Sequence, residues 1–136
     1  MNAKYATSAY GKVQLETDVA GANPHRLIAL LFEAAIVAVH RATERMRARD
    51  IATKGAAISK AIQIIEEGLI VSLDENAGGE LAGRLKGLYR YMTQRLLLAS
   101  ARNDPAPLEE VARLLTDLKE AWAAIAPKDS LARPRG

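Results

Sequence analysis

The sequence predicts an all-α protein, an antiparallel up-down-up-down four-helix bundle with an N-terminal arm or short extra helix. Four runs repeat apolar residues at spacings of three and four, the period of an amphipathic helix. The connections between these runs are short, which excludes long crossovers. Of the 136 residues, 49% are hydrophobic but only 4% aromatic, so small aliphatic side chains dominate and favour closely packed helices. A chain of this length is expected to form one domain.

The stretch 73–92, LDENAGGELAGRLKGLYRYM, joins the second and third predicted helices. Leu73 is expected to close one helix, and residues 74–79 form the connection. Gly78 and Gly79 suit a reversal, because glycine tolerates a positive φ. The third helix is predicted to run from about Glu80 to Ala101, with one core stripe of Leu81, Leu85, Leu88, Met92, Leu96 and Ala99.

The first helix is predicted to begin at Asn23 and Pro24, since asparagine is a good N-cap and proline suits the first helical position. It runs to about Arg47, with a stripe of Leu27, Leu31, Ala35, Ala38, Ala42 and Met46. Arginines crowd its last turn, where cations complement the helix dipole. A nucleic-acid patch over residues 41–49 is the alternative interpretation.

The second helix is expected to start after an Asp50 N-cap and to reach about Leu73. Its core face is predicted to hold Ile58, Ala61, Ile62, Ile65, Leu69, Ser72 and Leu73. Residues 102–107 form a turn with two prolines, and the fourth helix follows to about Ala126. Its broad apolar face is predicted to hold Val111, Leu114, Leu115, Leu118, Trp122 and Ile125.

The two ends of the chain are predicted to lie outside the bundle, which spans residues 23–126. Residues 1–22 read as a mobile arm whose apolar anchors are Tyr10, Val13 and Val19. These side chains are expected to cover bundle surface. Residues 127–136 carry two prolines and three basic residues, and are predicted to be disordered.

The sequence offers poor candidates for catalysis or for binding a cofactor or metal. There is no cysteine, and the histidines His25 and His40 both fall on the first helix without a Glu three residues before them. No glycine-rich phosphate-binding motif is present. We therefore expect no enzyme, no cofactor and no metal. No apolar run approaches the roughly 18 residues of a membrane span, and the first residues lack a signal peptide's apolar core. The expected location is the cytoplasm.

Several apolar residues fall outside the predicted core stripes: Ile64, Val71, Tyr91, Leu97 and Leu98. A helix that buries one face would not need them. Two interpretations remain open. The bundle and its arm could bury these side chains internally, or the side chains could form a groove for a partner's amphipathic helices.

The chain resembles the flagellar secretion chaperone FliS family nearly from end to end. The resemblance rests on PHRLIALLFEAAI at residues 24–36, KAIQIIEEGL at 60–69, the stretch 73–92 and LKEAW at 118–122, with Ser8-Ala9-Tyr10 in the arm. Stretch 73–92 is the most specific part. The chain departs from the family pattern by having glycine at positions 68, 83 and 87, where better helix formers are usual.

The resemblance implies a cytosolic export chaperone that binds the C-terminal segment of flagellin, which is disordered as a monomer, and prevents premature polymerisation. Export machinery or regulators would be further partners, while nucleic acid, membrane insertion and cofactors are not implied. The expected contact residues are Tyr10, Val13, Val19, Ile64, Val71, Tyr91, Leu97 and Leu98. The alternative is a small regulatory or nucleic-acid-associated bundle that acts through its basic helix end.

Overall fold

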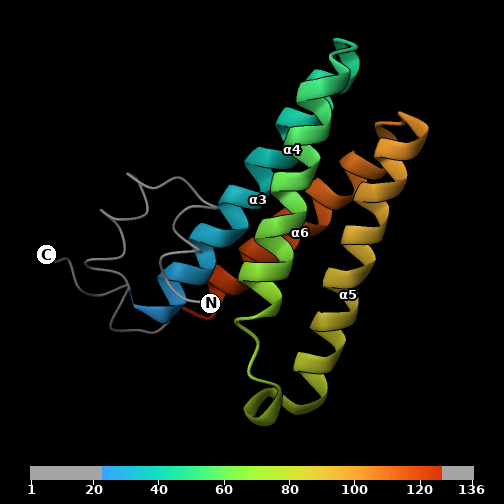
Figure 1. Cartoon of the computed structure of the whole chain (residues 1–136). Helices are drawn as coiled ribbons and strands as arrows, with labels where there is room; N and C mark the ends of the chain where they lie inside the picture. The colour runs from blue at the N-terminus through green and yellow to red at the C-terminus, as the bar shows by residue number, and fades with distance from the viewer. Residues whose placement is uncertain (1–22, 127–136) are drawn as a thin grey trace, which may run out of the picture.

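The computed structural model describes residues 23–126, and these form long helices joined by short connections (Figure 1). No strand occurs within this range. The all-α four-helix prediction is therefore confirmed. The elements are α3 (Pro24–Arg47), α4 (Ile51–Ile64), the π-helix η1 (Ile65–Ile70) that continues it, α5 (Glu75–Arg102) and α6 (Ala106–Ala124).

The helices form a ring in which each contacts its two neighbours. α3 packs along α4 and α6, while α5 packs against α6 and against the α4–η1 rod. Figure 1 shows α3 and α5 on opposite sides of the bundle. All four helices contribute to one apolar core, whose largest fully buried side chains are Val39, Ile64, Ile65, Leu69, Met92, Leu96, Leu108, Val111 and Leu115.

The predicted starts of the first two helices are confirmed by their caps. Asn23 Oδ1 accepts a hydrogen bond from the backbone N–H of Arg26 at 2.8 Å, and Pro24 is the first helical residue. Asp50 Oδ1 accepts from the backbone N–H of Thr53 at 3.3 Å. Each cap satisfies a donor that the helix itself cannot, which stabilises the helix by about 1 kcal/mol.

The N-terminal part of α5 needs both Gly78 and Gly79, for different reasons. α5 begins at Glu75 after an Asp74 N-cap, earlier than predicted, and then kinks at Gly79 (φ 55°, ψ −128°). Only glycine adopts such angles without strain. Gly78 lacks space instead, because an added Cβ would lie 2.8 Å from the Cβ of Ala82.

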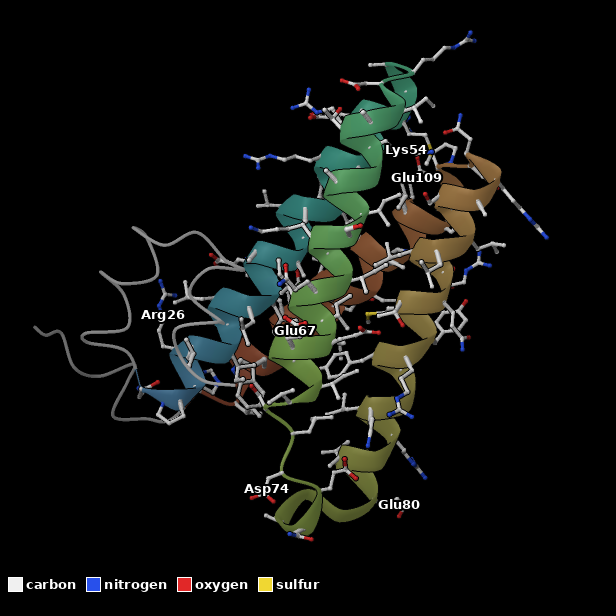
Figure 2. All side chains as sticks on the ribbon, viewed as in Figure 1. Arg26, Lys54, Glu67, Asp74, Glu80 and Glu109 are labelled. Carbon is white, nitrogen blue, oxygen red and sulfur yellow. The ribbon has the colours of Figure 1, made fainter. Side chains whose placement is uncertain are left out.

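The second helix contains a feature that the sequence did not predict, the π-helical turn η1 at its C-terminal end. Such turns use i→i+5 hydrogen bonds and so change the phase of the side chains that follow. Gly68 and Leu69 are buried within it. The turn also carries Glu67, whose Oε1 is buried with no hydrogen-bond partner among residues 23–126 (Figure 2).

The core stripe of α5 differs from the predicted one at its N-terminal end. Leu81 is 65% exposed, whereas Ala82 and Tyr89 are buried. Leu81 lies within about 20° of the buried Met92 around the helix, so its exposure reflects its position near the N-terminal end of α5, two residues after the kink at Gly79. Leu85 is half-buried. The core therefore begins one residue later than the leucine pattern suggested.

A reciprocal contact ties the start of α3 to the end of α6. The rings of His25 and Trp122 stack with centroids 4.5 Å apart and planes 8° apart. Trp122 Nε1 donates to the carbonyl of His25 at 2.9 Å. His25 Nε2 lies 2.7 Å from the carbonyl of Trp122 and must donate there, since a carbonyl oxygen only accepts. His25 thus has a structural partner.

A buried lysine joins α4 to the C-terminal end of α5. Lys54 Nζ donates to Asn103 Oδ1 at 3.2 Å and approaches the carbonyl oxygen of Ser100 at 3.4 Å. Figure 2 shows Lys54 in the upper part of the bundle. A cation at a helix C-terminus is favourable because unpaired carbonyls gather there. Asn103 supplies the left-handed residue that ends the helix (φ 53°).

Candidate partner-binding surface

Helix α5 carries more large exposed apolar side chains than any other element of the described structure. The full set is Val37, Ile51, Val71, Leu81, Tyr91, Leu97 and Ile125. Three of these, Leu81, Tyr91 and Leu97, belong to α5. Exposed apolar surface that is contiguous marks interaction sites more often than scattered single residues do. Leu81 lies about 80° from Tyr91 and about 160° from Leu97 around the helix, so it does not belong to a face shared by those two residues.

Of the predicted contact residues in the described structure, four are exposed or half-buried and one, Ile64, is buried. Val71 is 68% exposed and Leu97 is 59% exposed. Tyr91 is also exposed, and Leu98 is half-buried. The three predicted arm residues, Tyr10, Val13 and Val19, lie outside the described part of the chain.

The prediction that Ile64 lies off the core is wrong, because this side chain is only 1% exposed and belongs to the core cluster. Ile64 is seven residues after Ala57, so both point the same way from α4. Ala57 lines a pocket together with Ala38 of α3. That flank of α4 therefore faces α3. α4 is covered on two sides, by α3 and by α5, and buries a wider arc than one stripe.

Tyr91 and Leu97 lie on one outward face of α5, opposite the buried Tyr89 and Leu96. At about 100° per residue, Leu97 and Tyr91 mark the two edges of this face, about 120° apart. Gly83, Gly87 and Leu98 fall between these edges, and so do the exposed polar residues Arg90 and Gln94. We call Tyr91, Leu97, Leu98, Gly83 and Gly87 the outer face of α5. An apolar stripe on an amphipathic partner helix is of similar width, about 100° or more.

The two glycines of the outer face have no packing reason within the described structure. Gly83 and Gly87 are exposed, and an added Cβ at either would meet no heavy atom within 4 Å. Neither needs a positive φ. Each nevertheless costs about 1 kcal/mol relative to alanine inside a helix. Because they carry no side chains, they leave the α5 backbone uncovered in the region between the side chains of Tyr91 and Leu97.

Tyr91 is held in place by two residues beside it. Its hydroxyl donates to Glu110 Oε2 at 2.5 Å, and Arg95 Nε donates to Glu110 Oε1 at 2.7 Å. The Arg95 guanidinium also lies 6.0 Å from the centre of the Tyr91 ring. The hydrogen bond from Tyr91 is the largest cause that lowers the pKa of Glu110, and the bond to Glu110 raises the pKa of Tyr91. These contacts fix the orientation of the Tyr91 ring.

The sequence contained a signal for the outer face that its apolar residues alone did not give. Gly83 and Gly87 are four residues apart on a helix that otherwise holds good helix formers. This spacing places both on one side of the helix. Two glycines on one helix face, where no turn requires them, indicate that another part of a protein packs closely against the helix backbone. The sequence could not tell whether that part belongs to the same bundle or to a partner.

Two further findings concern other kinds of site. Within residues 23–126, no three histidine or carboxylate side chains gather closely enough to hold a metal ion. Among the same residues, no helix combines the length and the apolar character that crossing a bilayer requires.

The described structure is a helical bundle with exposed apolar side chains along α5. The family model described as "Flagellar protein FliS" matches residues 6–129 of the chain. The chain therefore belongs to the FliS family.

Curated relatives agree with this assignment. The chain is 46% identical to the flagellar secretion chaperone FliS of Salmonella typhimurium over 127 residues, which cover 93% of this chain and 94% of the relative. It is 41% identical to the FliS chaperone of Escherichia coli, over 98% of this chain and 95% of that protein. It is 44% identical to the chaperone FliSB of Pseudomonas aeruginosa, over 92% and 98%.

Proposed function

We propose that this protein is a cytoplasmic flagellar secretion chaperone that binds the C-terminal helical segment of flagellin and prevents it from polymerising before export. Membership of the FliS family and the names of the relatives support the chaperone role. The observation that supports a helical client is the outer face of α5. A client that is bound before secretion is met in the cytoplasm, which is where we place the complex.

The energetics of the outer face suit a client that folds as it binds. Burying one leucine side chain contributes roughly 1.5–3 kcal/mol, and Leu97 is 59% exposed in the free protein. Ordering a disordered segment costs part of this gain. Several such contacts are therefore needed for useful affinity, and the complex stays releasable.

The Tyr91 side chain is already ordered in the free protein, so the loss of its conformational entropy does not oppose binding. Its hydroxyl is bonded to Glu110 before the client binds. A rigid aromatic side chain loses little conformational freedom on binding. We expect the client to pack an apolar side chain against this ring and to lay its backbone over Gly87.

The predicted role of the N-terminal arm is retained as part of the proposal. Tyr10, Val13 and Val19 would cover apolar bundle surface in the free chaperone and move when the client binds. Removing residues 1–18 should then increase the binding of a hydrophobic dye.

The proposal is tested by titrating the full-length chain with flagellin from the same genome, with and without the flagellin C-terminal segment. Leu97→Asp should weaken binding at least about tenfold, equivalent to about 1.4 kcal/mol. Ile51→Asp is the matched control, because Ile51 is 61% exposed and lies on α4. Both variants should keep their helical content. If intact flagellin does not bind, the proposed function is wrong; if both variants bind normally, the assigned surface is wrong.

A further inference from the structure

A second surface, unrelated to the outer face of α5, lies between α3 and α4. These helices pack side by side (Figure 1). A pocket of about 250 Å³ opens there, and three of its lining residues are the cations Arg41 and Arg45 of α3 and Lys60 of α4. No carboxylate lines it. We call it the basic pocket.

The cations of the basic pocket form no salt bridges in the described structure. The ion pairs found within residues 23–126 involve none of Arg41, Arg45 and Lys60. Arg45 does act on Asp50, whose pKa is lowered mainly by hydrogen bonds from Thr53 and to a smaller extent by that arginine. Asp50 is already used as the cap of α4. Three positive charges therefore line a small concave site, and none of them forms an ion pair within residues 23–126.

The rest of the pocket is made of small residues and is mostly apolar. Ala38, Ala56, Ala57 and the polar Thr53 complete its lining. Val37 is exposed on α3, one helical turn before Arg41 and on the same side. A ligand for this site should therefore combine negative charge with apolar contact.

From this arrangement we infer that the basic pocket binds an acidic amphipathic segment of a protein partner. Arg41 and Arg45 are four residues apart, so their Cα atoms are separated by about 6 Å along α3. Carboxylates one turn apart on a partner helix match that spacing, with Lys60 on the opposite wall as the third cation. Apolar side chains of the partner would cover the alanines and Val37. The inference does not depend on the identity of the client bound at α5.

Nucleic acid is a poorer fit to the same residues. Binding to the phosphate backbone draws on many cations along a track, typically six to ten phosphate contacts. The arginines at the end of α3 do not form such a track, since Arg47 turns to α6 and pairs with Glu109. The chain as a whole carries a net charge of only +3.

The test uses the full-length chain and a labelled alanine–leucine peptide with three glutamates spaced four residues apart. A peptide with glutamine in place of glutamate and a single-stranded oligonucleotide of similar length are the comparison probes. Binding is followed by fluorescence anisotropy at low and moderate salt. The pocket variant is Arg41→Gln/Lys60→Gln/Arg45→Gln. The matched variant is Arg26→Gln/Arg102→Gln/Arg113→Gln, which removes the same charge from exposed positions outside the pocket lining.

The glutamate peptide should bind the parent, and the pocket variant should bind it at least about tenfold more weakly. The matched variant should stay within about twofold, and the glutamine peptide should bind at least tenfold more weakly than the glutamate peptide. Equal losses in both variants would show general charge attraction and overturn the inference. So would tighter binding of the oligonucleotide that depends on the pocket, or no binding of the glutamate peptide at all.

Discussion

The inner face of α5 carries Met92 and Leu96, both fully buried, whereas its outer face carries Leu97, which is 59% exposed. Leu96 and Leu97 are adjacent in the sequence and chemically identical, yet they point into different surroundings. The inner face also holds an alanine in close contact, Ala82, whose Cβ would clash with one added at Gly78. A Cβ added at Gly83 or Gly87 on the outer face would meet no such neighbour within 4 Å.

This contrast separates stability from binding on a single helix. Inner residues contribute to the free energy of folding through burial. Outer glycines reduce helix stability and contribute no internal packing. The two faces should therefore respond differently to substitution. Alanine at Gly79 should lower the free energy of unfolding, whereas alanine at Gly83 or Gly87 should raise it. Each prediction below tests one side of this comparison.

The largest effect is expected from the inner face. Leu96→Ala removes a fully buried side chain, and we expect the free energy of unfolding to fall by about 2–5 kcal/mol. Leu97→Ala, its neighbour on the outer face, should change stability by no more than about 0.5 kcal/mol. Urea denaturation followed by circular dichroism measures both. Equal losses in the two variants would show that the faces are not distinct.

The next effect is expected at the kink before the inner face begins. Gly79→Ala forces alanine into φ 55° and ψ −128°, which should destabilise the protein by more than about 1 kcal/mol. Gly55→Ala is the control, since Gly55 lies in α4 with open space around it and no positive φ. The control should gain about 0.4–1 kcal/mol. A stabilised Gly79→Ala variant would contradict the described junction.

A smaller effect concerns the tyrosine at the edge of the outer face. The pKa of Glu110 is lowered in the folded state, so its contribution to stability is present above the unfolded pKa and is lost as pH falls through the folded value. The pKa of Tyr91 is raised, so its contribution is lost as pH rises from near 10 through the folded value.

Carbon-detected NMR titration of the Glu110 carboxyl measures this directly. Its midpoint should lie below the ordinary value of 4.5. Tyr91→Phe removes the first cause of that shift and should move the midpoint upward, while Arg84→Gln, which affects a different ion pair, should leave it unchanged. A midpoint that does not respond to Tyr91→Phe would show that the ring is not held by Glu110.

Local rules predicted much of the bundle correctly from the sequence. Asn23-Pro24 and Asp50 fixed two helix starts, because capping is set by a few adjacent residues. The spacing of Met92, Leu96 and Ala99 identified the face of α5 that is buried. The π-helical turn η1 was not predictable in this way, since nothing in the local apolar pattern distinguishes it from an α-helix.

The errors arose where burial depends on which helices are neighbours. Ile64 looked like a surface residue because one stripe was assumed for a helix that is covered on two sides. Leu81 looked buried because leucines were aligned without knowing the kink at Gly79. Tyr91 and Leu97 were identified as off-core residues because they break the stripe. The spacing of Gly83 and Gly87 already placed them on one side of the helix, but only the fold shows that this side is exposed.

The central claim is that the outer face of α5 is kept open for a client at the expense of stability. The direct test is the affinity of Gly83→Ala/Gly87→Ala for the flagellin C-terminal segment, measured by calorimetry on a variant whose unfolding midpoint is also recorded. The account predicts a more stable protein, by about 0.4–1 kcal/mol per substitution, that binds the segment at least about tenfold more weakly. Gly55→Ala should gain similar stability per substitution and bind normally. A double variant that is more stable and binds as tightly as the parent would contradict the claim.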